Sequence, residues 1–549
     1  MSICQYSHDD DLTRRLPASL RREVVTVSAF RGGKSLAEAD RGYNLSPRQA
    51  PALASRRPRG VLMTAVGSGT PHGMAVFDGN LFFVRGTTLY CMDPEAVLAV
   101  GTVSDTHKRF FVFGDRLYLF PDKLYVAAGE TALHPMELDT GILDKSTFRG
   151  DTVTLPAGYA WSSLGFAAGD CLRVVNADND IPAPEGNYRI TRVNGRVATL
   201  LGSFPTTYES KARFRRVVPD LERVCVNGDR VYGFAGKDIY VSAAGSALDF
   251  YSRGASDGSD PATLHLGSEG DVTACVAWQG YVVFFKADRI CKLLGTRADS
   301  FTLQDRPAVG ITARLADTLC EVGGDLYYLA EGGVYRYGGQ EPVCISAAGD
   351  AGVRGGVGGT DGMAYYLAVK RVGNVWRQYV YLPERGEWFA EDDLEPAFMI
   401  LRDGFLCIQG ADGYLWQTSS DGRETYCAYD ERRLSGAVSA SAVLLPDYGL
   451  QPDGGRLLRV AIRATARAGN HDEGEPSLEV FADYADGSAS LDADGSREVS
   501  LGRFTGAMSD RLLRIPVPPR LCDGVRLRLA MKGDWTVHAV MREYERGGQ

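Results

Sequence analysis

Two short stretches of this chain carry residue types that act as nucleophiles or phosphate ligands in enzymes. Gly254 to Gly258 (GASDG) fits the G-x-S-x-G pattern of hydrolases. That nucleophile requires a strand before it and a helix after it, and here a polar loop rich in Gly, Ser and Asp follows. Gly32 to Ser35 (GGKS) resembles the end of a phosphate-binding loop, but the first glycine would fall at Ser28 and no βαβ pattern follows. We therefore interpret the first stretch as a surface loop and reject the second as a phosphate site.

Metal-ligating residues show no complete motif. Asn176, Asp178 and Asp180 resemble the start of a calcium loop, but Ile181 stands where that loop needs glycine and Asn187 where it needs glutamate. This pattern is typical of a solvated turn. The seven histidines show neither H-x-x-x-H nor H-E-x-x-H spacing. The sequence predicts no metal site and no cofactor.

Paired carboxylates for glycoside hydrolysis are equally unsupported. The stretch GADGYLW, with Asp412, Gly413 and Trp416, is the nearest to the Asp-box of sialidase propellers, and its residue order is wrong. It is better interpreted as a hairpin turn followed by an aromatic residue. Carboxylates brought together from distant parts of the chain leave no spacing signal. On the motifs present, we predict that the chain is not an enzyme.

The elements that would position any site come from one recurring stretch. Gly73 to Tyr90 (GMAVFDGNLFFVRGTTLY) runs as strand, Asp-Gly turn, strand, second turn and aromatic, and Asp-Gly is a strong hairpin signal. The same order returns at turn glycines Gly79, Gly114, Gly228, Gly280, Gly324, Gly362 and Gly404. Most steps are roughly 35–50 residues, the length of a propeller blade. We predict an all-β fold with a β-propeller of about seven blades; the alternative is a hairpin-rich β-sandwich.

One step is too long, and it divides the chain into domains. Between Gly114 and Gly228, short strands and an Asn-Gly turn predict a small β-barrel inserted at 143–217. After residue 420, apolar and charged residues alternate as in half-buried antiparallel strands. The predicted organisation is an extended arm at 1–58, the first propeller blades at 59–142, the inserted barrel at 143–217, the remaining blades at 218–420 and a β-sandwich at 421–549.

Composition limits the class of protein. The chain has 549 residues, of which 44% are hydrophobic, and no apolar stretch reaches the length of a membrane span. The N-terminal residues lack the apolar core of a secretory signal. The eleven cysteines include no C-x-x-C pair, so we expect reduced thiols that pack as small apolar groups.

Charge separates the arm from the body. The chain carries a net charge of −9, but its first sixty residues hold eleven basic and six acidic residues, a net +5, which leaves −14 for the remainder. An acidic body does not hold nucleic acid through its phosphates. We expect the arm to lie against a neighbouring subunit. The predicted partner-contact residues are the arm arginines Arg14, Arg15, Arg21, Arg22, Arg48, Arg56, Arg57 and Arg59.

Several phrases together resemble virion proteins of tailed bacteriophages. They are the basic, proline-punctuated GYNLSPRQAP and RRPRG, IYVSAAGSALDFYS, WQGYVVFFKADRICKL with DLYYLAEGGVYRY, and the closing DGVRLRLAMKGDWTVHAVMREYERGGQ. The layout is most similar to the tail nozzle, or tubular-tail, proteins of short-tailed phages. The inserted barrel and the C-terminal sandwich are the parts that map least well onto that family.

This resemblance implies a structural role in the virion. In the nozzle family, propeller-like subunits form a ring, usually a hexamer, below the portal and adaptor, and genomic DNA leaves through the ring without sequence-specific binding. The protein would be made in the bacterial host cytoplasm and act in the phage tail. Two alternatives stay open. One is a tail-tip or hub protein that recognises host-surface glycan through Trp161, Trp376 and Trp388, and the other is a polysaccharide-cleaving enzyme.

Overall fold

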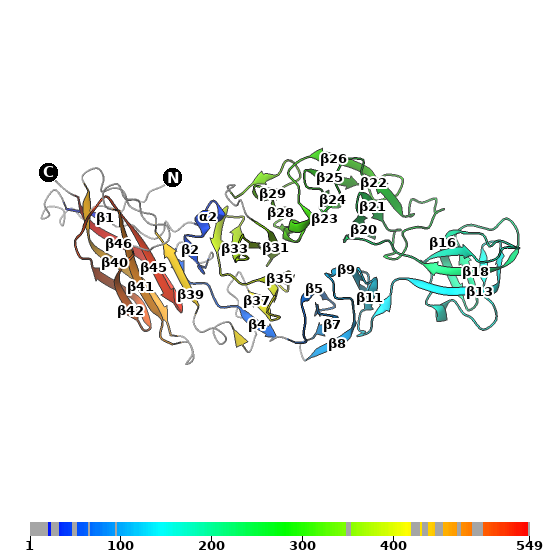
Figure 1. The fold of residues 1–549 in the computed structure, drawn as a ribbon, viewed down its shortest axis with the longest axis horizontal. Helices are drawn as coiled ribbons and strands as arrows, with labels where there is room; N and C mark the ends of the chain where they lie inside the picture. Colours follow the sequence, from blue (N-terminus) through cyan, green and yellow to red (C-terminus); the bar gives the residue numbers. More distant parts are fainter. Residues whose placement is uncertain are drawn as a thin grey trace.

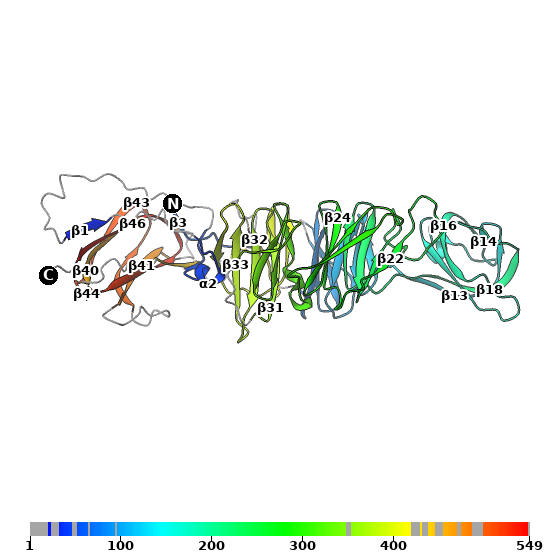
Figure 2. The same ribbon diagram turned by 90° about the horizontal axis from the view of Figure 1, so that it is seen from above.

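The computed structural model is built almost entirely of β-strands, arranged as three bodies in a row (Figures 1 and 2). A sandwich lies at one end, a propeller in the middle and a barrel at the other end, and the first and last described strands, β1 (Leu20–Glu23) and β46 (Asp534–Arg546), both lie in the sandwich (Figure 1). The structure describes residues 20–23, 32–46, 52–63, 66–93, 96–346, 353–418, 429–430, 438–444, 454–468, 474–485 and 498–546. The described part of the chain contains no helix with the length and hydrophobicity of a membrane span.

The middle body is a seven-bladed propeller of antiparallel sheets, six of them four-stranded and the seventh five-stranded, numbered here in chain order (Figure 1). Blade 1 is β5 (Pro71–Phe77), β6 (Asn80–Arg85), β7 (Thr88–Met92) and β8 (Val97–Thr102). Blade 2 is β9 (Arg109–Phe113), β10 (Arg116–Phe120), β11 (Leu124–Ala127) and β12 (His134–Pro135). Blade 3 is β19 (Arg223–Asn227), β20 (Arg230–Ala235), β21 (Asp238–Val241) and β22 (Ala262–His265). Blade 4 is β23 (Ala274–Trp278), β24 (Tyr281–Phe285), β25 (Arg289–Leu294) and β26 (Thr302–Pro307).

The remaining three blades complete the circle. Blade 5 is β27 (Cys320–Val322), β28 (Asp325–Ala330), β29 (Gly333–Tyr337) and β30 (Val343–Cys344). Blade 6 is β31 (Gly355–Thr360), β32 (Tyr365–Lys370), β33 (Trp376–Leu382) and β34 (Glu387–Ala390). Blade 7 begins with β35 (Pro396–Arg402), β36 (Phe405–Gly410) and β37 (Leu415–Thr418). The first strand of blade 7 packs against the first strands of blades 6 and 1, so the ring closes as the repeats predicted.

The ring is closed by a strand from far upstream in the chain. Strand β4 (Gly60–Met63) pairs with β37 and becomes the fourth strand of blade 7, and β38 (Tyr429–Asp430) pairs with its other edge. We expected residues after 58 to open the first blades, so this assignment is a correction. The pairing covers the outer edge of β37, which would otherwise be an unpaired strand edge of the last blade.

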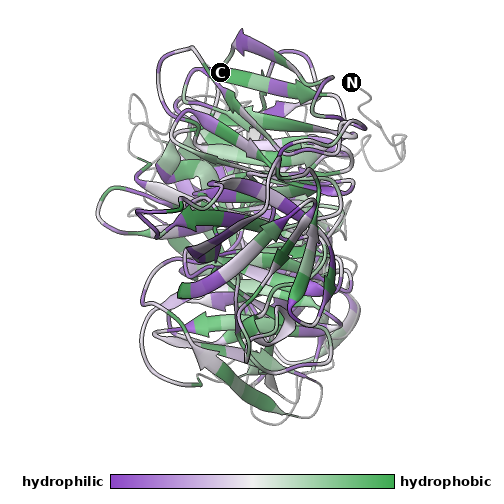
Figure 3. Ribbon diagram, turned by 90° about the vertical axis from the view of Figure 1, so that its right-hand side faces the viewer, coloured by the Kyte–Doolittle hydropathy of each residue, from purple (hydrophilic) through white to green (hydrophobic). Residues whose placement is uncertain are grey.

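The predicted hairpin turns have the backbone that their sequences require. At the first Asp-Gly turn, Asp78 has φ 50° and Gly79 has φ 74°, the left-handed values of a type I′ turn. Asp403 and Gly404 repeat the pair at 52° and 78°. Hydropathy colouring shows hydrophobic and hydrophilic segments alternating along the strands (Figure 3), as expected for half-buried sheets.

The inserted body is a closed six-stranded barrel in the order β13-β14-β17-β16-β15-β18. Its strands are β13 (Leu138–Arg149), β14 (Thr152–Thr154), β15 (Cys171–Asn176), β16 (Gly186–Asn194), β17 (Val197–Leu200) and β18 (Tyr208–Arg216), with a 3-10 turn η2 (Ser162–Leu164). The first strand starts at Leu138, five residues before the predicted boundary at 143. Trp161 and Phe214 are fully buried at the centre of its core.

The sandwich combines both ends of the described chain. One sheet contains β1 (Leu20–Glu23), β46 (Asp534–Arg546), β40 (Gly455–Arg467), β43 (Met508–Pro516), β3 (Leu53–Ala54) and β44 (Leu521–Cys522). The other is ordered β2 (Gly42–Tyr43), β39 (Ser439–Val443), β45 (Gly524–Lys532), β41 (Ser477–Ala485) and β42 (Val499–Thr505). Segment 421–438 was predicted as sandwich, yet its described strand β38 belongs to the propeller.

The described parts of the predicted arm are integrated into the chain's own fold. Strands β1, β2 and β3 add to the two sheets of the sandwich. The short helix α2 (Leu36–Ala39) begins at the Ser35 cap and buries Leu36 and Ala39 in the core shared with blades 4 to 6. A polar segment with few apolar residues cannot fold alone, and the described parts of this one pack on the sandwich and on blades 4 to 6 of the same chain.

Ring closure by β4 gives a direct stability prediction. Val61 in β4 is 5% exposed and packs in the core between blades 6 and 7. We expect Val61→Asp to destabilise the propeller by about 3 kcal/mol or more, because the new carboxylate has no buried partner. Val112→Asp is the matched control, since Val112 is a propeller-strand valine that is 41% exposed. Thermal unfolding should show a lower midpoint for the Val61 variant only; equal midpoints would contradict the role of β4.

Candidate functional site

Three charged residues from different blades meet at the propeller axis. Arg109 begins the innermost strand of blade 2, Arg223 begins that of blade 3, and Asp317 lies in the 3-10 turn η3 (Ala313–Thr318) just before blade 5. Nη1 of Arg109 lies 2.6 Å from Oδ1 of Asp317, and Nη2 of Arg223 lies 3.0 Å from the same oxygen. This axial triad therefore links blades on opposite sides of blade 4 and bridges the propeller axis.

Within the axial triad, the two arginine charges stabilise the charge of the aspartate. Burial alone would raise the pKa of the Asp317 carboxyl, but the Arg223 and Arg109 guanidiniums outweigh burial and lower it to about 2. The carboxylate is thus ionised at neutral pH and accepts hydrogen bonds from both arginines. Both arginines that donate to the carboxylate come from the chain itself, so the triad is a structural bridge between blades.

The neighbouring titratable groups are uncharged at neutral pH. Burial and the nearby Arg109 lower the pKa of His107 to about 4, so this imidazole is neutral at pH 7 and packs 4.9 Å from the Phe398 ring. A hydrogen bond with Cys275, together with burial, raises the pKa of the Cys225 thiol. The raised pKa leaves the Cys225 thiol protonated at neutral pH, and a thiol is a much weaker nucleophile than a thiolate. Within the described ranges, no group of three metal-ligating side chains converges.

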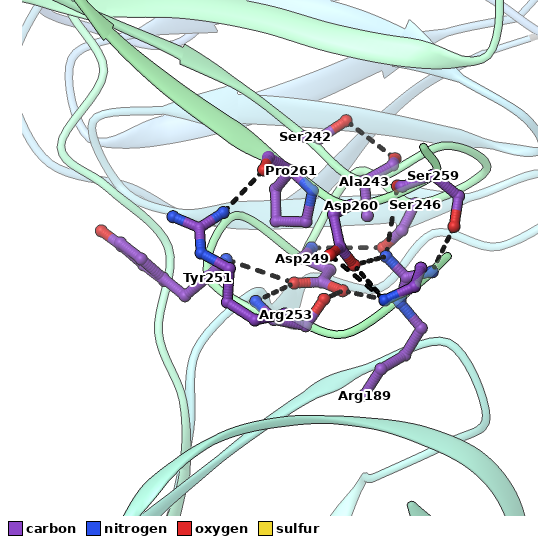
Figure 4. A network of polar contacts seen from close by, with 12 residues as sticks. Arg189, Ser242, Ala243, Ser246, Asp249, Tyr251, Arg253, Ser259, Asp260 and Pro261 are labelled. Carbon is purple, nitrogen blue, oxygen red and sulfur yellow. Dashed lines mark hydrogen bonds and ion pairs between the residues drawn. The ribbon is translucent and has the colours of Figure 1, made fainter. Parts of the chain in front are cut away.

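The joint between barrel and propeller is a second polar cluster (Figure 4). Asp249, in the loop between β21 and β22 of blade 3, is fully buried and accepts Nε of Arg189 from barrel strand β16 at 3.2 Å. The same guanidinium donates to the side-chain and backbone oxygens of Ser259 at 3.0 and 3.2 Å. Ser252 donates its hydroxyl and its backbone N–H to Asp249. A buried carboxylate with this many donors is well compensated.

Both chain crossings between propeller and barrel are also fixed. Lys123 of blade 2 donates to Glu137 at 2.9 Å, just before the barrel, and pairs with Asp220 at 2.7 Å, just after it. At the barrel base, the buried Arg216 donates to the carbonyls of Met136 at 2.7 Å and of Pro135, in β12 of blade 2, at 3.2 Å. With Arg189 and Asp249, these contacts attach the barrel to the propeller at several points rather than by one flexible linker.

The joint between sandwich and propeller is formed by the arm. Nη2 of Arg59 lies 2.7 Å from Glu391 and 3.0 Å from Asp392, and Nη2 of Arg56 lies 2.9 Å from Asp392. Burial opposes ionisation of Asp392, but Arg59 and Arg56 outweigh it and hold its pKa well below the ordinary range. Oδ1 of Asn44 accepts a hydrogen bond from Nε of Arg56 at 2.6 Å. Nδ2 of Asn44 donates one to the Ser439 carbonyl of the sandwich at 3.0 Å. We call this cluster the arm clasp.

The predicted partner-contact arginines therefore have different positions. Arg56 and Arg59 are 7% and 2% exposed inside the arm clasp, which differs from the expected contact with another subunit. Arg57 between them is exposed. Arg21 and Arg22 lie in β1 of the sandwich. Arg14, Arg15 and Arg48 lie outside the described residues.

Several residues that the sequence marked as candidates for chemistry or binding lie in turns or in the core. The segment 254–258 is a loop without a following helix, as predicted. Oδ1 of Asp178 accepts the backbone N–H of Asp180 at 3.0 Å, the geometry of a solvated turn. Trp161 and Trp388 are 0% exposed, so the expectation that they bind glycan is wrong for these two.

Sequence patterns did not mark the residues of the axial triad. Arg109 and Asp317 are separated by 208 positions, and Arg223 and Asp317 by 94. Each is an ordinary charged residue at the start of a strand or in a polar turn. Only the closure of the ring brings these three residues together. The hairpin repeat was therefore the sequence feature that could have indicated their contact.

Comparison with known proteins identifies no relative. No family model matches the chain, and no curated protein sequence matches it. Among solved structures, the designed Ika8 protein is 12% identical with a TM-score of 0.35 and covers 66% of this chain and 100% of its own. BamB from Moraxella catarrhalis is 11% identical with a TM-score of 0.33, covering 74% of this chain and 99% of its own. KlHsv2 is 8% identical with a TM-score of 0.30, covering 64% and 100%.

The axial triad predicts a specific acid sensitivity. The folded pKa of Asp317, about 2, lies below its ordinary value of 3.8. Its contribution to stability is therefore complete above the ordinary value and is lost as pH falls toward the folded one. We expect Asp317→Asn to cost about 1–2 kcal/mol at pH 7, a value reduced from that of a fully buried pair because the group is partly exposed.

Urea unfolding between pH 7 and pH 2.5 measures this effect. The difference in unfolding midpoint between the wild type and Asp317→Asn should shrink as the pH falls. Asp510→Asn is the control, because Asp510 pairs with Arg463 on the exposed sandwich surface. A constant difference at every pH would show that the Asp317 charge does not stabilise the fold.

The barrel joint predicts a loss of rigidity when its cation is removed. Arg189→Met leaves the buried Asp249 without its guanidinium, which should cost about 1.5–3 kcal/mol. Limited proteolysis should then cut the crossings near residues 137 and 218 faster than in the wild type. Arg192→Met, an exposed arginine on the same strand, is the matched control. Unchanged cleavage in the Arg189 variant would contradict the proposed attachment.

Proposed function

We propose that this chain is a structural component of a bacteriophage tail, a ring-forming nozzle subunit below the portal and adaptor through which genomic DNA leaves. The proposal starts from the sequence resemblance to tail nozzle proteins. The observation that carries it is the attachment of barrel and sandwich to opposite sides of the propeller through buried ion pairs. A subunit with three rigidly connected bodies presents its outer bodies at a defined separation, as an assembly component requires.

The conduit in this proposal lies between subunits. The axial triad occupies each propeller's own axis, with two arginines bound to one carboxylate. A polymer as wide as DNA would have to break these contacts to pass through a single propeller. A ring of several copies, expected to be a hexamer from the resemblance, would instead enclose a lumen lined by outer propeller or sandwich surfaces.

The charge distribution supports passage without binding. Outside the first sixty residues the chain carries a net charge of −14, and such a surface repels phosphate. DNA would therefore move along the lumen without being retained. Among the predicted partner-contact arginines whose burial is described, Arg57 is exposed, and we assign it to contact with a neighbouring subunit or the ring above.

A non-enzymatic role agrees with the state of the polar groups. In the described part of the propeller axis, the carboxylate is paired, the histidine is neutral and the Cys225 thiol is protonated. The proposal therefore assigns these groups to stability. No step of catalysis is needed for the function proposed.

Assembly of the purified full-length chain tests the proposal. Mass photometry should show a species at an integral multiple of 59.5 kDa, and negative-stain images should show closed rings. Arg57→Ala should raise the concentration needed for assembly about tenfold while leaving the melting temperature unchanged. Arg385→Ala is the control; Arg385 is a half-buried arginine of blade 6 whose side chain is 31% exposed. A protein that stays monomeric alone and with added adaptor would contradict the nozzle assignment.

A further inference from the structure

The outer face of the five-stranded sandwich sheet contains a hollow of about 340 Å³. Its lining residues come from all five strands, β2, β39, β45, β41 and β42. The volume lies within the range of small-ligand sites, roughly 300–1,000 Å³. We call it the sheet groove.

The hollow follows from the strand register. One row across the sheet runs from Tyr43 through Ser441, Ala530 and Glu479 to Arg503. Short side chains stand at the centre of this row and long ones at its ends, so the middle of the face is depressed. Alternate residues of the same strands, such as Ala440, Ala442 and Met531, point into the sandwich core.

A second row places hydroxyls beside a cation. Lys532 lies in register between Ser439 on one side and Ser477 on the other. With Ser441 and the phenol of Tyr43, the sheet groove thus presents four hydroxyl groups. Each hydroxyl both donates and accepts hydrogen bonds, which suits a ligand that is itself rich in hydroxyls.

Two of the charged residues that line the groove, Arg528 and Glu479, have hydrogen-bond partners among the described residues. Arg528 donates to Glu498 from Nε at 2.8 Å, and its guanidinium stacks 4.3 Å over the Phe481 ring. Glu479 accepts the Ser500 hydroxyl at 2.7 Å. Arg503 and Lys532, by contrast, form no ion pair with any residue that the structure describes. The lining therefore holds three cations, Arg503, Arg528 and Lys532, against one carboxylate, that of Glu479, which lies in register with Arg503. The hydroxyl-lined hollow thus has an excess of positive charge.

We infer that the sheet groove binds an acidic monosaccharide, with its carboxylate held by Arg503 and Lys532 and its hydroxyls paired with Tyr43, Ser439, Ser441 and Ser477. A guanidinium matches the geometry of a carboxylate, and an ammonium adds a point charge. Two cations are too few to hold a nucleic-acid backbone at ordinary salt, and the lining is too polar for an apolar ligand. This binding activity goes beyond a conduit role, which needs no saccharide site.

Isothermal titration of the full-length protein tests the inference directly. The probes are glucuronate and N-acetylneuraminate, with neutral glucose and inorganic phosphate as comparison ligands. At least one acidic sugar should bind about tenfold or more tightly than glucose and phosphate. The double variant Arg503→Gln/Lys532→Gln should weaken that binding about tenfold or more at an unchanged melting temperature.

A matched double variant controls for the loss of two positive charges. Arg463 and Arg467 lie on the other sheet of the sandwich, 57% and 73% exposed, so Arg463→Gln/Arg467→Gln should bind the acidic sugar as the wild type does. The inference is overturned if neither acidic sugar binds, or if the groove variant retains wild-type affinity. It is also overturned if phosphate binds as tightly as the acidic sugars and depends equally on Arg503 and Lys532, since the site would then recognise charge alone.

Discussion

The whole arrangement depends on one strand pairing, that of β4 with β37. The last blade takes three strands, β35 to β37, from the end of the repeat and its fourth from Gly60–Met63, so this pairing joins the two ends of the propeller. This pairing requires the preceding segment to approach blade 7 past blade 6, where Gly33 bridges Trp388 and the arm clasp forms. The segment that leaves blade 7 starts from the same side. The sandwich is therefore built where both ends of the repeat meet.

Much of the fold could be predicted from local chemistry, because hairpins are local. The Asp-Gly turns at Gly79 and Gly404 determine where strands begin and end, and their spacing determined the number of blades. Long-range pairings have no such signal. The positions of β4 in blade 7 and of β2 beside β39 depend on partners more than 300 residues away. The sequence predicted only an extended arm around β2 and the first propeller blades around β4.

The candidate sites show the same limit more strongly. The runs at 254–258 and 176–180 have the spacing of chemical motifs, and both are turns in the structure. Asp317, Asp249 and Asp392 have no motif, and each is the centre of a cluster that joins distant segments. In a fold made of repeated hairpins, polar residues become important through closure and docking, which are properties of the assembled ring. Arg56 and Arg59 illustrate this, since a basic arm looked like a surface feature and is an internal contact.

The composition of the sandwich has a consequence for the order of folding during synthesis. Its sheets require Gly42–Tyr43 and Leu53–Ala54 from early in translation and Asp534–Arg546 from the final part. The propeller and barrel can complete their own pairings by residue 430, while the early strands still wait for partners. The sandwich is thus the last body to form, and a chain cut short before β46 would keep unpaired strand edges exposed. Such edges mark incomplete molecules for aggregation or degradation before they reach an assembly.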